Sequence, residues 1–98
     1  MLILYKLELT GPVGVVKISA TEATLLQAFD QSPDARLNFE QVAQCMGLVL
    51  SEEQKANIQV RMVRLRKKLY QAGAEGAVIE AIRNVGYQFF EELTVRKS

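Results

Sequence analysis

The sequence has no histidine, no tryptophan and a single cysteine, Cys45. These absences exclude intramolecular disulfides, Cys/His zinc sites and any acid–base or triad catalysis that depends on histidine. The carboxylates are dispersed along the chain, and no nucleophile is paired with a base. We therefore expect no enzyme activity, no metal site and no cofactor, and we expect Cys45 to be a small buried hydrophobic residue.

Long apolar runs and a strong net charge are also missing. A helix that crosses a bilayer needs about 20 apolar residues, whereas the apolar stretches here are only a few residues long. Met1–Leu4 is too short for the apolar region of a secretory signal. With 98 residues, 49% apolar content and a net charge of +1, the chain is expected to form one domain over residues 1–98. We expect that domain in the cytoplasm and not at a membrane, unless a segment outside this sequence sets its compartment.

The near-neutral total hides a local excess of positive charge. One segment carries six basic residues and no acidic one: Lys55, Arg61, Arg64, Arg66, Lys67 and Lys68. Such a run usually faces an anionic partner. However, the helix dipole also favours basic residues near a helix C-terminus, and many surface lysines are simply solvated. Charge alone therefore leaves a nucleic-acid-binding face and a solvated face about equally open.

Capping patterns indicate where three helices begin. Ser19, Asn38 and Ser51 each stand three residues before a Glu or Gln, a pattern in which the two side chains can bond to each other's backbone N–H. Gly47 and Gly73 can supply the left-handed residue that ends the second and third helices. The sequence therefore predicts three helices between about residue 19 and residue 73.

Strand patterns flank the helices on both sides. Residues 3–18 are rich in β-formers and are broken by Thr10-Gly11-Pro12, which predicts an antiparallel pair. Residues 78–93 are again β-rich, and Asn84-Val85-Gly86 suits the tip of a hairpin. The order of strands, three helices and a closing hairpin predicts an α+β winged helix-turn-helix fold, with the hairpin as the wing. Arg83, just before the tip, stands where an arginine could enter the minor groove, although an ordinary charge at a strand end is about equally common at such a position.

The third predicted helix has two different faces. At about 100° per residue, one narrow sector has the spacing of a helix packed on a core: Ile58, Met62, Leu65 and Leu69. A stripe roughly 130° away contains Asn57, Val60, Arg61, Arg64 and Lys68. Arg66 lies on the other flank, and Lys67 lies opposite the core. Because Arg can read guanine and both Lys and Arg neutralise phosphates, this stripe is the candidate DNA-reading face.

Three segments resemble the signature segments of the OmpR/PhoB-type winged-helix effector domain: ISATEATLLQAF (18–29), VRMVRLRKKL (60–69) and IEAIRNVGYQFF (79–90). They follow that family's order and nearly its spacing, over about residues 15–90. The resemblance implies a transcription-factor output domain that binds double-stranded DNA, commonly as head-to-tail pairs on direct repeats, with the third helix in the major groove. It also implies that the loop Gly47–Ser51 contacts RNA polymerase. Family members often carry an N-terminal receiver domain, and the segment before Ile18 is too short to be one.

Residue by residue, the resemblance assigns roles to several arginines. Arg64 is expected to face the groove, Arg66 to contact phosphate, and Arg61 to contact base or phosphate. Arg83 matches the wing arginine that reaches the minor groove, and Asn84 replaces a usual glycine beside it, although Asn tolerates a left-handed backbone. The full set of expected DNA-binding residues is Lys55, Asn57, Val60, Arg61, Arg64, Arg66, Lys67, Lys68, Arg83 and Asn84.

Some positions depart from the family pattern. Ala56 stands where many members have an arginine that grips phosphate, and Gln59 replaces a common aspartate. The N-terminal sheet has room for two or three strands instead of four. These departures concern the affinity for DNA more than the fold.

A second hypothesis is a winged helix that binds protein without reading DNA. Its surface would be apolar and would draw on Val49, Leu50, Val63, Phe89 and Phe90. Phe89 and Phe90 are adjacent in a predicted strand, so they point to opposite faces and only one need enter the core. For Val63 and Tyr70 we favour packing against the wing or sheet over exposure, by roughly two to one.

Overall fold

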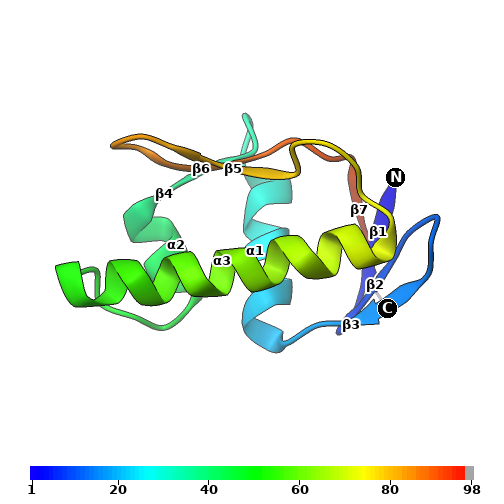
Figure 1. Cartoon of the computed structure of the whole chain (residues 1–98), viewed down its shortest axis with the longest axis horizontal. Coiled ribbons are helices and arrows are strands. Elements are labelled where there is room, and N and C mark those ends of the chain that lie inside the picture. Colours follow the sequence, from blue (N-terminus) through cyan, green and yellow to red (C-terminus); the bar gives the residue numbers. More distant parts are fainter. Residues whose placement is uncertain (97–98) are drawn as a thin grey trace.

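The computed structural model describes residues 1–96, so Lys97 and Ser98 of the predicted domain lie outside the described residues. It has the predicted α+β architecture of strands, three helices and a hairpin (Figure 1). In chain order the elements are β1 (Leu2–Tyr5), β2 (Glu8–Thr10), β3 (Val15–Lys17), α1 (Ala20–Gln31), β4 (Arg36–Asn38), α2 (Phe39–Cys45), α3 (Glu52–Ala72), β5 (Ile79–Ile82), β6 (Gly86–Phe89) and β7 (Leu93–Arg96). The long helix α3 runs past both other helices, with the N-terminal sheet at its C-terminal end (Figure 1).

The N-terminal sheet has more strands than the antiparallel pair that the sequence predicts. Its order is β3-β2-β1-β7, with β1 and β2 antiparallel and β7 parallel to β1. The prediction of one continuous strand before Thr10 is wrong. The chain turns at Lys6, whose φ of 55° is left-handed, and continues as β2. The fourth strand comes from the far end of the chain, where Leu93 pairs with Leu2.

The hairpin forms at the predicted place. Strands β5 and β6 are antiparallel, with Ile82 opposite Gly86, and Asn84 in the turn between them has a left-handed φ of 62°. The sequence did not predict β4, which adds a third strand in the order β4-β6-β5. Gly86 permits this pairing, because a Cβ at that position would lie 2.0 Å from the carbonyl oxygen of Leu37 in β4.

The predicted caps begin all three helices. The Ser19 hydroxyl accepts from the N–H of Glu22 at 3.1 Å, while a Glu22 carboxylate oxygen accepts from the N–H of Ser19 at 2.8 Å. Asn38 and Gln41 make the same reciprocal pair at the start of α2, at 2.8 Å in each direction. Ser51 Oγ accepts from the N–H of Gln54 at the start of α3. Gly73 ends α3 with a left-handed φ of 117°.

The core lies between α1, α3 and the two sheets. The predicted inner face of α3 is buried: Ile58, Met62, Leu65 and Leu69. Phe29 of α1 stacks on Phe89 of β6 with ring centroids 5.6 Å apart, so Phe89 is the core member of its pair, and Phe90 is 53% exposed. Cys45 is half-buried against this core, and burial raises the pKa of its thiol.

Two side chains of α3 are more exposed than expected. Val63 is 46% exposed and Tyr70 is 42% exposed, so the expectation that both pack at the core margin is wrong. Both project from the face turned away from Ile58 and Leu65. Tyr70 donates its hydroxyl to the carbonyl of Gly76 at 2.6 Å, in the loop before the hairpin.

Candidate nucleic-acid interface

The basic run spreads around α3 and does not form one patch. Arg64 and Lys67 are exposed, while Arg61, Arg66 and Lys68 are half-buried at the two margins of the buried face. Arg61 and Lys68 lie on the margin that faces α1, and Arg66 lies on the margin that faces the hairpin. The α3 surface therefore divides into an α1 side, an outer side and a hairpin side.

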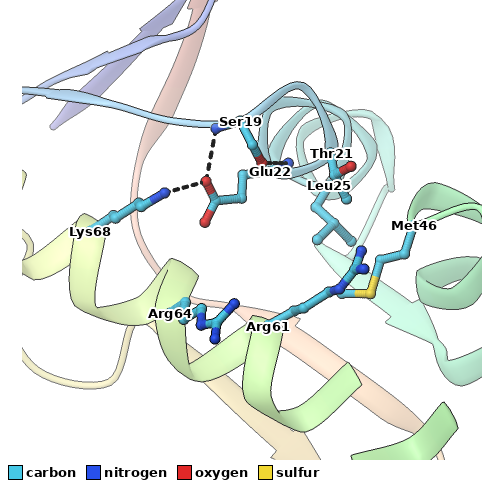
Figure 2. Close-up of a pocket in the computed structure, with 8 residues that line it drawn as sticks. All are labelled: Ser19, Thr21, Glu22, Leu25, Met46, Arg61, Arg64 and Lys68. Atoms are coloured by element: carbon cyan, nitrogen blue, oxygen red, sulfur yellow. Dashed lines mark hydrogen bonds and ion pairs between the residues drawn. The ribbon is translucent and has the colours of Figure 1, made fainter. Parts of the chain in front are cut away.

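On the α1 side, the first turn of α1 and the middle of α3 enclose a cleft of about 360 Å³. It is lined by Ser19, Thr21, Glu22, Leu25, Met46, Arg61, Arg64 and Lys68 (Figure 2). Three of the ten predicted DNA-binding residues thus meet in one cleft, although Arg61 and Lys68 are two helical turns apart. The cleft is polar and cationic on the α3 wall.

Lys68 is already paired within the protein. Its Nζ lies 2.7 Å from Oε1 of Glu22, the same oxygen that accepts from the N–H of Ser19 (Figure 2). Burial, the largest single influence on Glu22, raises the pKa of its carboxyl, but the hydrogen bonds from Lys68 and Ser19 and the charge of Lys68 together hold that pKa below its usual value of 4.5. Glu22 is therefore ionised at neutral pH and balances the charge of Lys68.

On the hairpin side, the Arg66 side chain hydrogen-bonds to the backbone of β5. Its Nε and a terminal guanidinium nitrogen donate to the carbonyl oxygen of Ile79 at 3.1 and 2.9 Å. The same guanidinium lies near Tyr87, where its charge partly offsets the rise that burial causes in the pKa of the Tyr87 hydroxyl. Arg66 therefore ties α3 to β5, and its expected contact with phosphate stays a prediction.

The remaining cations of α3 differ in their surroundings. Lys55 pairs with Glu52 at 3.0 Å, one turn earlier on the exposed surface, and Asn57 donates to Gln54 at 3.1 Å. Within residues 1–96, no protein hydrogen bond or ion pair engages the side chains of Arg61, Arg64 or Lys67. These three positive groups are the ones available to an external anion.

The wing brings two further predicted residues close to α3. Arg83 and Asn84 are exposed in the turn between β5 and β6. Asn84 shares a small cleft of about 150 Å³ with Lys55 of α3, so the hairpin tip lies beside the N-terminal half of that helix. A ligand on α3 and a ligand at the wing tip would therefore be neighbours.

Sequence reasoning missed two residues that shape this surface. Glu22 was expected only as a cap, and its pairing with Lys68 joins residues 46 positions apart. Ile79 acts through its carbonyl, which no side-chain pattern reveals. The capping box could locate Glu22 at the start of α1, but it carries no information about the partner across the cleft.

The described part of the chain offers neither a metal-ligand cluster nor a membrane-spanning helix. Within residues 1–96, no three or more His, Cys, Asp or Glu side chains group together as metal ligands would. No helix in that part of the chain is long and apolar enough to cross a membrane.

A family model described as "Transcriptional regulatory protein, C terminal" matches residues 14–89. The chain belongs to this family, the OmpR/PhoB type. As an OmpR/PhoB-type domain it is a DNA-binding unit of a transcription regulator and not an enzyme. This confirms the general prediction of a DNA-binding regulator domain and the prediction that it is no enzyme.

A solved structure supports the family assignment. The C-terminal domain of NsrR, a nisin resistance regulator described as a lantibiotic response regulator, has a TM-score of 0.61 and 26% sequence identity to this chain. The similarity covers 84% of this chain and 82% of the NsrR domain. No curated protein sequence matches the chain. The OmpR/PhoB-type assignment therefore rests on the family match and on the shared winged-helix fold.

Proposed function

We propose that this domain binds double-stranded DNA with sequence preference and places α3 in the major groove. The proposal rests on a difference among the basic side chains of α3, because some have a hydrogen-bond or ion-pair partner in the protein and others have none in the described part of the chain. Arg61, Arg64 and Lys67 have no protein partner among residues 1–96, whereas Arg66 and Lys68 have one. The buried face of α3 fixes the helix on the core. Basic side chains on its remaining surface that have no protein partner can hydrogen-bond to guanine or neutralise phosphates.

Within the stripe, the residues have different chemical roles. Arg64 is exposed and carries the fork of donors that pairs with the O6 and N7 of guanine, so we assign it to base reading. Asn57 has an amide that can pair with adenine, and Val60 offers an apolar contact for a thymine methyl group. Arg61 and Lys67 flank this centre, and we assign them to phosphate.

The wing extends the contact beyond the major groove. Arg83 is exposed in the hairpin turn beside α3, which supports insertion into the adjacent minor groove. Asn84 holds the left-handed position of that turn, and we assign it a phosphate contact. Lys55 and Arg66 already have partners in the protein, so we give them secondary roles in DNA binding.

The loop Gly47–Ser51 is a second contact surface. Val49 is 84% exposed, the most exposed of the large apolar side chains, while Leu48 beside it is half-buried against the core. An exposed apolar side chain on a loop that is held to the core supports a contact with another protein. We assign RNA polymerase as that protein, as the family resemblance implies. We also propose binding as head-to-tail pairs on direct repeats and, because the ligand is genomic DNA, a place in the cytoplasm.

The experiment is a titration with duplex DNA over a range of salt concentrations, after selection of bound sequences from random DNA. Three to five phosphate contacts predict a log–log slope of about −3 to −5. A repeat spacing of about 10 to 11 base pairs in the selected sequences would support pairing. Lys6→Ala, in the turn between β1 and β2, removes a positive charge that belongs neither to α3 nor to the wing and serves as the control. Absence of salt-dependent binding to any duplex would contradict the proposal and favour a protein-binding winged helix.

A further inference from the structure

The ion pair between Lys68 and Glu22 differs from an ordinary surface pair. Its N–O distance is 2.7 Å, and the side chain of Glu22 is only 12% exposed, against 34% for Lys68. The Glu22 carboxylate is also fixed by the N–H of Ser19 at 2.8 Å, so it does not need to move in order to meet Lys68. Because the Glu22 carboxylate is already oriented by this bond, less conformational freedom is lost on pairing than in an exposed pair.

The pair changes the charge of the cleft in which it lies. The walls carry three cations, Arg61, Arg64 and Lys68, and one anion, Glu22 (Figure 2). Lys68 and Glu22 compensate each other, which leaves the two arginines as the uncompensated charges. A DNA phosphate that approached Lys68 would also approach a carboxylate 2.7 Å from it.

Taking Lys68 away from Glu22 is unfavourable for a second reason. Within residues 1–96, Glu22 would then remain as a mostly desolvated carboxylate that accepts only from the N–H of Ser19. An ionised group left in such a place loses much of its stabilisation, whereas Lys67 on the exposed surface reaches a phosphate without breaking any contact. Lys68 must therefore give up an ion pair in order to bind a DNA phosphate, whereas Lys67 gives up no such pair within residues 1–96.

We propose that Glu22 is a positioning residue that withholds Lys68 from DNA phosphates and so limits the sequence-independent affinity of the α3 surface. This inference rests on the proposed DNA-binding function and deepens it. It removes Lys68 from the ten residues expected to bind DNA. It also assigns a second role to Glu22, beyond capping α1.

The test compares the salt dependence of DNA binding in the wild-type chain with four variants: Lys67→Gln, Lys68→Gln, Glu22→Gln and the double variant Glu22→Gln with Lys68→Gln. Each phosphate contact contributes about 0.9 to the log–log slope. Lys67→Gln should make the slope about 0.9 less steep, and Lys68→Gln should leave it unchanged. Glu22→Gln should release Lys68 and make the slope about 0.9 steeper, and the double variant should return it to the wild-type value.

Controls separate this inference from changes in folding and from loss of the proposed function. Glutamine can still accept from the N–H of Ser19, so Glu22→Gln keeps the cap, and thermal melting followed by circular dichroism checks the fold. Glu92→Gln removes an exposed carboxylate after β6 and reports the effect of net charge alone. Equal losses of slope in Lys67→Gln and Lys68→Gln would overturn the inference while leaving the proposed function intact. A wild-type chain that binds no duplex would overturn the proposed function, and the inference with it.

Discussion

The guanidinium of Arg66 donates two hydrogen bonds to the carbonyl oxygen of Ile79, at 3.1 and 2.9 Å. These bonds join the middle of α3 to the first strand of the wing, which follows it in the chain. The orientation of the hairpin relative to α3 thus depends in part on a side chain that the family resemblance assigned to phosphate.

We expect Arg66→Ala to lower the free energy of unfolding by about 1 to 2 kcal/mol. A hydrogen bond to a charged group contributes about 1.5 to 3 kcal/mol when buried, and Arg66 is only half-buried. Urea unfolding measures the change, and Lys67→Ala, one residue further on the exposed surface, is the matched control. An unchanged unfolding midpoint in Arg66→Ala would show that the bonds to Ile79 contribute nothing to stability.

Arg64 and Lys67 should affect DNA binding in different ways. Arg64→Ala should cost about 1 to 3 kcal/mol on the preferred sequence and relax the preference at one base position, because it removes a base contact. Lys67→Ala should weaken binding to all sequences alike and make the salt slope about 0.9 less steep. Competition binding with a set of single-base operator variants measures both effects. Arg64→Ala with an unaltered sequence preference would contradict the assignment of Arg64 to the groove.

The loss of DNA affinity on removal of the wing arginine should depend on the sequence that flanks the main site. Arg83→Ala is expected to weaken binding most on A·T-rich flanks, where the minor groove is narrow and its negative potential is strongest. Paired duplexes with the same core and either A·T-rich or G·C-rich flanks measure the difference. Equal losses on the two duplexes would place Arg83 on phosphate instead of in the minor groove.

The lowered pKa of Glu22 predicts how stability changes with acidity. A carboxyl whose pKa is lower in the folded than in the unfolded chain contributes stability above its usual value of 4.5, and this contribution is lost as the pH falls through the folded pKa. The wild-type chain should therefore be more stable than Glu22→Gln at pH 7, and the difference should shrink below about pH 4.5. Urea unfolding at several pH values measures it, with Glu92→Gln as the control. A difference that stays constant down to pH 3 would contradict the ion pair with Lys68.

Features that depend on near neighbours could be predicted from the sequence. The caps at Ser19 and Asn38 join groups three residues apart, and the buried face of α3 repeats at the spacing of a single helix. The wing turn at Asn84 follows from a residue that tolerates a left-handed backbone. In each case the partners or the period lie within a few residues, so the order of the amino acids is sufficient.

The tertiary structure alone decided which of the basic residues are available to a ligand. The pairing of β7 with β1 brings together opposite ends of the chain, and the ion pair of Lys68 with Glu22 spans 46 residues. No local sequence pattern predicts contacts between residues so far apart in the chain, because Lys68 and Glu22 meet only after α1 and α3 have packed on their shared core. The sequence by itself determined that six positive charges lie on one helix of a winged-helix domain. Packing then placed Lys68 and Arg66 against protein groups and left Arg61, Arg64 and Lys67 without a protein partner in the described part of the chain, since a side chain's partners depend on what lies beside it in space.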